Sequence, residues 1–389
     1  GDVYKRQGWK AVDKYTFQVT FTGPFQYAVV LMAFPSFFPV NKTAYESAGG
    51  NKKYGTDADK LAYNGPFTIT SWVHEDSIVL EKNPDYWNAD NIKLDKITMR
   101  MISQENTAIN EFNNGSIDMI GLTGDNIAQF ENAQGFDDGG AWYLEFNSQE
   151  KPYNNAKVRK ALTLGVDAQK MVDTIVQNDS KVATTFTPPA VAQGAFTEYC
   201  GDIFQHVTNN DYSEAKALLE EGLKEEKLTL AEFSPELLCD DTSAAKQQAE
   251  FLQAQLKENL GVSLQIKQVT YKTRLANMDK GEFEIVFAGW SPDYNDPMTY
   301  LDMWVTGNGN NHGKWSNAEY DKIIEEASQI ADKDAYYAKL KEAEEILAEE
   351  CPIGFIYDRQ TSYVTSDRLK GVIRTAFQDI NLNYAYIEE

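Results

Sequence analysis

The stretch that decides the fold reads Gly289-Trp290-Ser291-Pro292-Asp293-Tyr294-Asn295-Asp296-Pro297. It follows directly on the apolar run Phe283 to Ala288, which predicts a buried strand. The amphipathic run Met298 to Trp304 comes next, so the segment between them is predicted to be a loop at the carboxyl end of that strand. Open α/β sheets bind ligands at this end of their strands. The loop is therefore the first candidate for a binding site.

The two aspartates of this loop favour different interpretations. Asp296 precedes Pro297, and an Asp N-cap with proline at the first helical position satisfies backbone N–H groups that a helix start leaves unpaired. Asp293 has no such capping role: it is either an Asx-turn residue or an anion presented to a cationic group of a ligand. Trp290 is either a core residue or part of a pocket.

On both sides of the loop, strand patterns alternate with helix patterns. Apolar runs predict strands at 15–21, 67–73, 78–81, 97–102, 117–120 and 262–266. Helical spacing predicts helices at 106–113, 155–166, 213–223, 243–260 and 272–279, with Ser213 as an N-cap and Gly261 as a stop. The acidic stretch 317–350 predicts a pair of solvated helices. This interleaving predicts an α/β fold.

The length and the composition of the chain limit the classes of protein to which it could belong. The chain has 389 residues, which predicts two or three domains, and its formal net charge is -23. Such a surface repels phosphate backbones and anionic headgroups, so nucleic-acid binding is a poor hypothesis. The longest apolar stretch, Tyr27 to Val40, is interrupted by Pro35 and is too short to span a bilayer. The opening residues lack an initiator Met, a signal-peptide pattern and a lipid-attachment Cys, which favours a fragment whose true start is missing.

The sequence offers no pattern typical of catalysis, metal binding or a cofactor. The three histidines lie far apart, without a Cys at ligand spacing, so no zinc or His-based catalytic site is predicted. Gly307 to Lys314 misses the spacing of a phosphate loop, and we interpret it as an exposed glycine-rich loop. Carboxylates are abundant, but no pair stands out for glycoside hydrolysis. Cys200, Cys239 and Cys351 are predicted to be buried free thiols, with a Cys200–Cys239 disulfide as the alternative.

Several motifs recur together along the chain. They are Asn64-Gly65-Pro66-Phe67 followed by Trp72, Asn83-Pro84-Asp85-Tyr86-Trp87, Gly115-Ser116-Ile117-Asp118, Val158-Arg159-Lys160-Ala161-Leu162 through Asp167, and the loop Gly289 to Pro297. In their order and spacing, the chain resembles the oligopeptide- and dipeptide-binding proteins of ABC importers, which form family 5 of the extracellular solute-binding proteins. The resemblance runs from about Gly8 to the end of the chain.

The resemblance implies an α/β fold of the periplasmic-binding-protein-like type (type II), with two lobes joined by a hinge and the N-terminal part of lobe I missing. We expect residues 1–41 to be a remnant of a lobe I subdomain, 42–187 to be lobe I, 188–356 to be lobe II, and 357–389 to return to lobe I. The predicted hinge crossings lie at Pro188-Pro189 and at Gly354 to Tyr357.

The resemblance also implies a set of ligand-binding residues. The candidates are Asp293, Trp290, Gly289, Ser291, Tyr271, Asn147, Phe287 and Phe34. Asp293 would hold the N-terminal ammonium of a peptide. Gly289 and Ser291 would offer backbone groups to the extended ligand, and Trp290 would line the pocket beside it.

The remaining candidates lie outside this loop. Asn147 matches a strand of the opposite lobe that faces the ligand, and Tyr271 stands where relatives often have Trp. Phe34 is a further candidate from the apolar stretch near the start. Phe287 occupies a position where some relatives carry an Arg for the carboxylate of the ligand, so this chain departs from them in C-terminal recognition. No catalytic residue, metal or cofactor is implied.

The resulting prediction is an extracytoplasmic protein, in the periplasm or on the cell surface as a lipoprotein, that captures peptides for the permease of an ABC transporter. Strand pairing and a carboxylate for the terminal amine would bind what all peptides share. We expect a monomer with no enzymatic activity and no membrane contact besides a lipid anchor. The alternatives are a non-peptide solute on the same fold, such as a nickel complex, haem or a sugar, and a secreted hydrolase that uses carboxylates.

Overall fold

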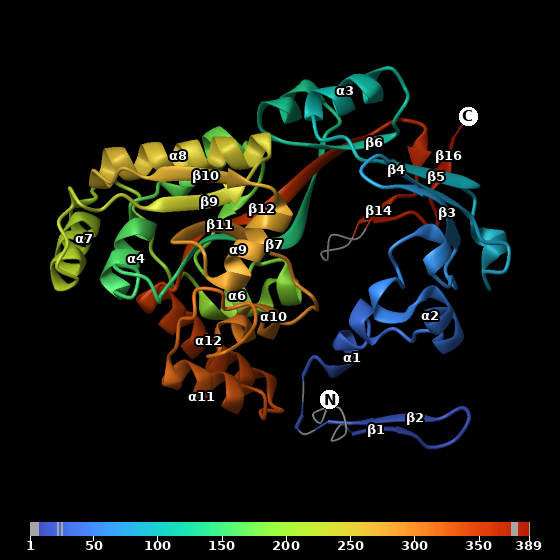
Figure 1. Cartoon of the computed structure of the whole chain (residues 1–389), viewed down its shortest axis with the longest axis horizontal. Helices are drawn as coiled ribbons and strands as arrows, with labels where there is room; N and C mark the ends of the chain where they lie inside the picture. Colours follow the sequence, from blue (N-terminus) through green and yellow to red (C-terminus); the bar gives the residue numbers. More distant parts are fainter. Residues whose placement is uncertain (1–7, 22, 25, 375–379, 389) are drawn as a thin grey trace.

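The computed structural model describes residues 8–21, 23–24, 26–374 and 380–388. Its largest sheet has seven strands in the order β10-β9-β11-β7-β12-β6, and β8 pairs with β12. These strands are β6 Met119–Leu122, β7 Gln134–Phe146, β8 Lys181–Val182, β9 Glu236–Asp240, β10 Gln265–Val269, β11 Ile285–Trp290 and β12 Ile353–Thr365. Strand β9 runs parallel to β10 and β11, whereas β7 runs antiparallel to β11 and β12. Figure 1 shows most of this sheet and its helices as one body, on the left, whereas β6 lies towards β4 and β5 of the smaller body on the right.

Sequence patterns predict the longer helices of this main body and the run 298–304, but not the short helical elements between residues 168 and 200. The helical elements are α4 Ala156–Leu164, α5 Ala168–Met171, η7 Val172–Val176, η8 Val191–Gly194, α6 Ala195–Cys200, α7 Ser213–Glu225, α8 Ser243–Leu260, α9 Tyr271–Lys280, α10 Met298–Leu301, η9 Asp302–Trp304, α11 Ala318–Ala327 and α12 Lys333–Glu350. Helix α8 ends at Gly261, whose φ of 76° suits glycine. The predicted N-cap Ser213 is wrong, because Ser213 is the first helical residue and its hydroxyl donates to Asp211. Similarly, α10 starts after Pro297, one residue later than predicted.

A smaller body lies beside the main one, on the right of Figure 1. It contains β3 Phe67–Val73, β4 Ser77–Lys82, η5 Ala89–Asn91, β5 Lys96–Arg100, α3 Glu105–Asn113, η6 Gly124–Gln129, β13 Leu369–Lys370, β14 Ile373–Arg374, β15 Ile380–Asn381 and β16 Tyr386–Ile387. Strands β3, β4 and β5 form an antiparallel sheet. The predicted strands and helix of this region are therefore confirmed, with shifts of a residue or two at their ends.

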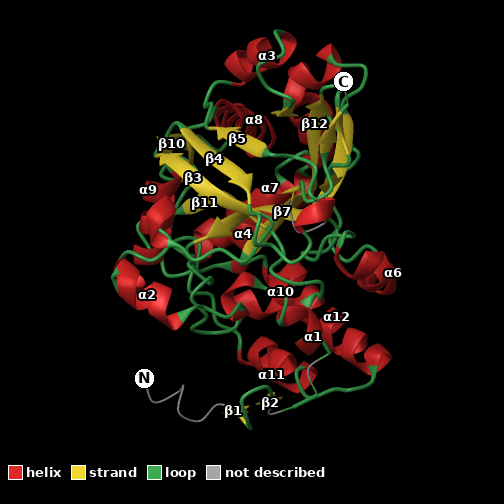
Figure 2. Cartoon of the chain, turned by 90° about the vertical axis from the view of Figure 1, so that its right-hand side faces the viewer, coloured by secondary structure: helices red, strands yellow, loops and turns green. Residues whose placement is uncertain are grey.

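An N-terminal segment precedes the smaller body in the chain. It contains β1 Gly8–Ala11, β2 Phe17–Thr20, α1 Ala28–Leu31, η2 Pro35–Phe37, α2 Lys42–Ala48, η3 Gly50–Lys52 and η4 Ala58–Lys60. Strand β2 was expected to be half-buried, but Phe17 is 65% exposed, because β2 pairs only with β1. Figure 2 shows this hairpin at the edge of the molecule, below α11.

The two long strands β7 and β12 connect the bodies. They pair with each other from the level of Ile353 to that of Tyr363. Phe146 at one end of the pair lies in the main core, whereas Val364 at the other end lies in a small second cluster. The register shifts twice between Phe355 and Gln360. Such irregular pairing bends a strand locally, so this is where we expect the bodies to rotate against each other.

The main hydrophobic core does not divide at Pro188-Pro189. Val158 and Leu162 of α4, which were expected in lobe I, are fully buried in the same cluster as Leu237 and Val286, which were expected in lobe II. They share it because α4 packs against both α7 and β12. The predicted boundary at residue 188 thus falls inside one packed body. We propose β7 and β12 as the connections instead, and the predicted crossing at Gly354 to Tyr357 lies within β12.

Two segments that were predicted to be exposed to solvent, α12 and the loop after Gly307, are partly buried, because each contacts the interior of the main body. Helix α12 is not simply solvated: its Glu344 is fully buried and accepts the backbone N–H groups of Phe186 and Thr187 at 2.7 and 3.0 Å. The loop after Gly307 is not exposed throughout, because the N–H of Gly313 donates to the buried Glu145 at 2.8 Å.

The three cysteines are free and buried, as predicted, so the alternative disulfide does not form. Among the described residues, no helix is long and apolar enough to cross a membrane.

Candidate functional site

The predicted loop emerges from β11 where that strand loses one of its two neighbours. Strand β9 pairs with β11 only at Ile285 and Val286, whereas β7 accompanies β11 as far as Trp290. From Phe287 onward, the edge of β11 that faces away from β7 therefore has no strand partner in the described sheet. Backbone N–H and C=O groups on such an edge are free to pair with another extended chain.

Aromatic side chains surround this part of β11. The ring of Trp142 on β7 lies 5.2 Å from that of Phe287 and stacks on Tyr357 of β12 at 6.0 Å. Gly289 pairs with Trp142, and a Cβ at Gly289 would meet its indole at 2.9 Å. Glycine is thus required here by close packing. The indole N–H groups of Trp142 and Trp290 are buried and have no acceptor among the described residues.

The loop itself is held by hydrogen bonds on both sides of Asp293. The backbone N–H of Asp293 donates to the hydroxyl of Thr299 at 3.0 Å. The carboxylate of Asp296 accepts the N–H of Met298 at 2.9 Å and the hydroxyl of Tyr336 at 2.6 Å. Asp296 thus bonds to the first residue of α10, but the N-cap position is occupied by Pro297 and not, as predicted, by Asp296. The backbone around Asp293 is therefore fixed before any ligand arrives.

Asp293 differs from Asp296 in what its carboxylate contacts. The side chain of Asp293 reaches solvent, and within the described residues it makes no hydrogen bond or ion pair. The protein packed around it nevertheless raises the pKa of Asp293, because partial burial disfavours the charged form. Burial also raises the pKa of the nearby Asp302 to about 7, with the negative charges of Asp293 and Asp296 adding to the effect. The site thus holds excess negative charge that a cation would relieve.

A buried ion pair links this loop to the crossing strands. Arg359 of β12 contacts Asp138 of β7 at 2.8 Å, and Asp138 is fully buried. The same guanidinium lies 3.4 Å from the hydroxyl of Ser291 and 5.9 Å from the ring of Trp142. The hydroxyl of Tyr300, just after the loop, donates to the carbonyl of Gly139 on β7. One arginine and one tyrosine therefore tie the loop to the two strands that connect the bodies.

The structure brings five of the predicted residues together and leaves three apart. Phe287, Gly289, Trp290, Ser291 and Asp293 follow one another along β11 and its loop. Phe287 is almost fully buried, so it lies beneath the site and not on its surface.

Asn147 lies at the opposite end of β11 from the loop, because Phe146 pairs with Ile285 at the start of that strand. Asn147 is buried, and its amide donates to the carbonyls of Gly281 and Phe283 at 3.1 and 2.9 Å. Its side chain is therefore fully used in joining β7 to β11, in the main body and not in an opposite lobe.

The other two candidates are exposed or half-exposed. Tyr271 opens α9, is 60% exposed and lies under the guanidinium of Arg274 at 5.2 Å. Phe34 is half-buried and follows α1, to which its N–H is bonded through the carbonyl of Leu31.

Tyr27 lies beside the loop but is not among the site residues that the sequence predicts. Its ring stacks on that of Tyr294 at 4.8 Å and an interplanar angle of 17°. The amide of the adjacent Gln26 donates to the carbonyls of Ile330 and Ala331, between α11 and α12. The only signal was that Tyr27 and Phe34 share one aromatic-rich stretch.

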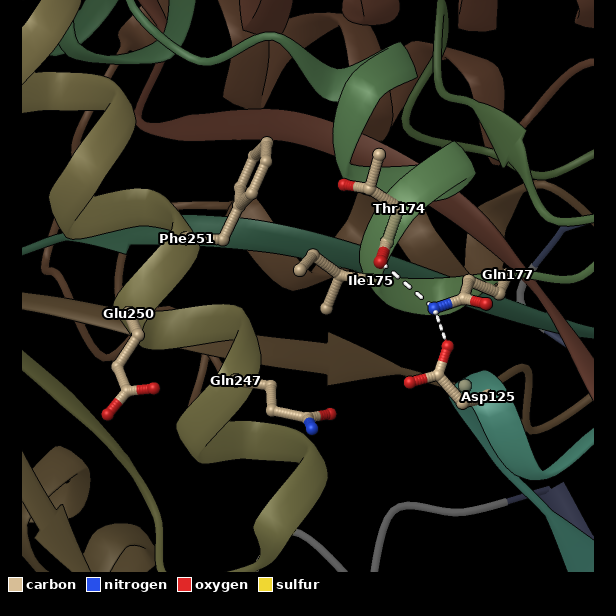
Figure 3. A pocket seen from close by; sticks show the side chains of 8 residues that line it. Asp125, Thr174, Ile175, Gln177, Gln247, Glu250 and Phe251 are labelled. Atoms are coloured by element: carbon tan, nitrogen blue, oxygen red, sulfur yellow. Dashed lines mark hydrogen bonds between the residues drawn. The ribbon is translucent and has the colours of Figure 1, made fainter.

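A second contact between the bodies lines a separate cavity of about 240 Å³, shown in Figure 3. In it, the amide of Gln177 donates to the carboxylate of Asp125 in η6 at 2.7 Å. Gln177 follows the π-helix η7 with a positive φ of 56°. Glu250 and Phe251 of α8 form the opposite wall. Within the described residues, no group of three or more His, Cys, Asp or Glu gathers in a way that could hold a metal ion.

Fold and candidate site together are those expected of a two-bodied solute-binding protein, in which a loop with an unpartnered carboxylate follows a central strand of the described sheet. The chain belongs to the bacterial extracellular solute-binding proteins, family 5, whose family model matches residues 3–312. It is 32% identical over 381 residues to the dipeptide-binding protein DppE of Bacillus subtilis, an alignment that covers 96% of this chain and 69% of DppE. It is also similar to the structure of Listeria monocytogenes OppA bound to peptide, with a TM-score of 0.88 and 31% identity over 98% of this chain and 75% of that one.

Two structures of the murein tripeptide-binding protein MppA differ in their likeness to this chain. Both are 26% identical to it and cover 98% of it. The Escherichia coli MppA structure, of which 74% is covered, gives a TM-score of 0.86, whereas the unliganded open form of MppA, of which 73% is covered, gives 0.65. The bodies of this chain are therefore arranged as in the peptide-bound OppA, and unlike the open MppA.

Proposed function

We propose that this protein binds peptides outside the cytoplasm and delivers them to the permease of an ABC importer, with Asp293 holding the N-terminal ammonium of the peptide. The observation that carries the proposal is the carboxylate of Asp293, which has no partner among the described residues although its loop is fixed on both sides. An ammonium group is the cation that every unblocked peptide offers. A charge-assisted hydrogen bond to it is about twice as strong as a neutral one.

The free edge of β11 favours a peptide over other ligands that carry a positive charge. An extended peptide that pairs with Phe287 to Trp290 would gain backbone hydrogen bonds whatever its sequence. Its first residue would then lie at the end of the strand, where Asp293 follows after three residues. The names of the relatives support the same ligand class, since DppE is called a dipeptide-binding protein and the Listeria OppA structure contains a peptide.

The remaining candidates have supporting roles in this proposal. Gly289 and Ser291 would present backbone groups, and Trp290 would cover the ligand from one side. Phe287 and Asn147 would not touch the ligand; they would hold β11 in place by packing and by hydrogen bonds. Tyr271 and Phe34 would contact only those ligands that extend beyond the loop.

We further propose that the protein acts as a monomer, that it meets the membrane through a lipid anchor and the permease, and that it turns over no substrate. Its place would be the periplasm or the cell surface. The family to which it belongs consists of binding proteins, which supports a receptor over a hydrolase.

Isothermal calorimetry with unblocked peptides of two to six residues tests the proposal. We expect saturable binding of peptides at one site, and no hydrolysis of those peptides when the mixture is analysed by mass spectrometry. Nickel complexes, haem and sugars, tested in the same way, should bind at least tenfold more weakly. Binding of one of these and not of any peptide would contradict the proposal, and so would cleavage of the peptide.

A further inference from the structure

Among the described residues, the N-terminal segment contacts the main body at Gly23, which lies against Gln329, and along the stretch Gln26 to Leu31. There the ring of Tyr27 stacks on Tyr294, and the amide of Gln26 donates to two carbonyls between α11 and α12. Tyr294 directly follows Asp293 in the chain. Tyr27 therefore covers the residue next to the proposed ammonium-binding carboxylate, although some 267 positions separate the two tyrosines in a chain of 389 residues.

The same segment is attached to the smaller body further along the chain. Helix η4 packs against β3, and the carboxylate of Asp57 contacts His74 at 2.8 Å. Figure 1 shows α1 between the main body and α2, which lies on the side of the smaller body. The contact of Tyr27 with Tyr294 is thus a contact across the interface between the two bodies.

Helix α1 itself is held weakly. It has four residues, no side-chain cap and no buried residue, and Val29 within it is 87% exposed. The stretch packs against the main body through partly buried side chains, namely Tyr27 and Leu31, and through the hydrogen bonds of Gln26. These contacts join the N-terminal segment to the main body, so they are lost when the two bodies separate.

The arrangement of the bodies matches the peptide-bound OppA at a TM-score of 0.88 and the unliganded open MppA at only 0.65. From this we infer that the stacking of Tyr27 on Tyr294, which we call the clasp, forms only in the closed arrangement and holds the two bodies together beside the ligand loop. The inference rests on the proposed peptide-binding function, and it adds a residue from outside the main body to the site. Since the clasp stabilises the closed arrangement, which must open before a ligand can leave, it slows ligand release more than it speeds ligand capture.

The burial of Tyr27 agrees with this role. Burial raises the pKa of the Tyr27 hydroxyl to about 12, and the negative charges of Asp302 and Asp296 contribute to the rise. The Tyr27 hydroxyl is thus close enough to these carboxylates to be affected by their charge. A clasp over this charged region also limits the access of water to a bound ammonium, which strengthens the pairing of that ammonium with Asp293.

Replacing the ring tests the clasp. An aromatic pair contributes enough to account for about a two- to tenfold change in an equilibrium constant. We expect Tyr27→Ala to raise the peptide dissociation rate two- to tenfold in stopped-flow measurements, with an association rate within about twofold of the wild type. Tyr27→Phe keeps the ring and should stay within about twofold. Tyr15→Ala is the matched control, because Tyr15 is 87% exposed in the same N-terminal segment, where the side chain of Lys14 lies over its ring.

A distance measurement separates failure of the clasp from failure of the proposed ligand. Spin labels on Asp90→Cys and Lys322→Cys report the separation of the two bodies, and the three native cysteines are buried. We expect Tyr27→Ala to reduce the short-distance population with and without peptide, compared with Tyr15→Ala. If peptide binds the wild type but Tyr27→Ala changes neither the dissociation rate nor the distances, the inferred clasp is wrong and the proposed function stands. If no peptide binds the wild type, the proposed function is wrong. The clasp can still be tested in that case, because equal distances in unliganded Tyr27→Ala and Tyr15→Ala would contradict it.

Discussion

The main body and the N-terminal segment are packed in opposite ways. In the main body, large side chains such as Trp304, Tyr300 and Tyr320 are fully buried around the helices that follow the ligand loop. In the N-terminal segment, α1 and α2 contain no buried residue and Tyr15 is 87% exposed. The residues proposed to bind the ligand terminus are thus held by a densely packed core, whereas the part that reaches over them is held by partly buried side chains. The largest losses of affinity should therefore come from substitutions in the core-bound site, and smaller losses from substitutions that weaken closure.

Asp293→Ala should have the largest effect, and only on ligand affinity. Truncating one partner of a desolvated ion pair costs about 2 to 5 kcal/mol, or roughly 30-fold to a few thousand-fold in the dissociation constant. The fold should be unchanged, because the Asp293 side chain bonds to nothing else among the described residues. Calorimetry with a peptide and urea unfolding measure the two quantities. Asp241→Ala, an exposed carboxylate on the same body, is the control and should change neither.

Asp302→Asn should have the next largest effect, on stability and its pH dependence. With its pKa raised to about 7 by burial, Asp302 holds a proton more tightly in the folded than in the unfolded protein. The wild type therefore loses stability as the pH rises from about 4 to about 7, by up to about 4 kcal/mol. Asp302→Asn should remove this loss, so it stabilises the protein at pH 7.5 and has little effect at pH 4.5. Equal effects at both pH values in urea unfolding would show that Asp302 does not titrate in this range.

Asn147→Ala should destabilise the main body by about 1 to 3 kcal/mol, because it leaves two buried carbonyls without a donor. The peptide dissociation constant at a temperature well below unfolding should change less than twofold. Asn113→Ala, on the exposed face of α3, is the control for the loss of an amide. A large loss of affinity with little loss of stability would restore the ligand-facing role that the sequence suggested for Asn147.

Asp125→Ala should have the smallest effect. It breaks the hydrogen bond to Gln177 that joins the two bodies beside the cavity of Figure 3. The bond is exposed, so its loss should weaken peptide affinity by about two- to fivefold through the closing equilibrium. Glu250→Ala removes a carboxylate from the same cavity without breaking that bond, and calorimetry should find it unchanged.

Sequence patterns predict those elements of the site that are determined by residues close to one another in the chain. Strand β11 is a continuous apolar run, and Asp296 and Pro297 mark the start of the next helix in the chain itself. The glycine at position 261 ends α8 for the same kind of local reason.

The parts that sequence patterns do not predict depend on pairing between distant segments. Asn147 was expected to face the ligand, but the register between β7 and β11 places it at the far end of the strand. Arg359 and Asp138 are 221 positions apart, and nothing near either residue indicates that they form a buried pair. The lobe boundary was placed at two prolines, whereas the long strands that connect the bodies contain mixed polar and apolar residues and give only a weak pattern.

The central claim is that a carboxylate on the rigid body recognises the amine of a peptide. Calorimetry with one peptide in its free and N-acetylated forms, against the wild type and Asp293→Ala, tests it most directly. Acetylation should weaken binding to the wild type by about the factor that Asp293→Ala costs with the free peptide, roughly 30-fold or more. It should have little further effect on Asp293→Ala, because the contact is already gone. Equal affinity of the wild type for the free and the acetylated peptide would contradict the account.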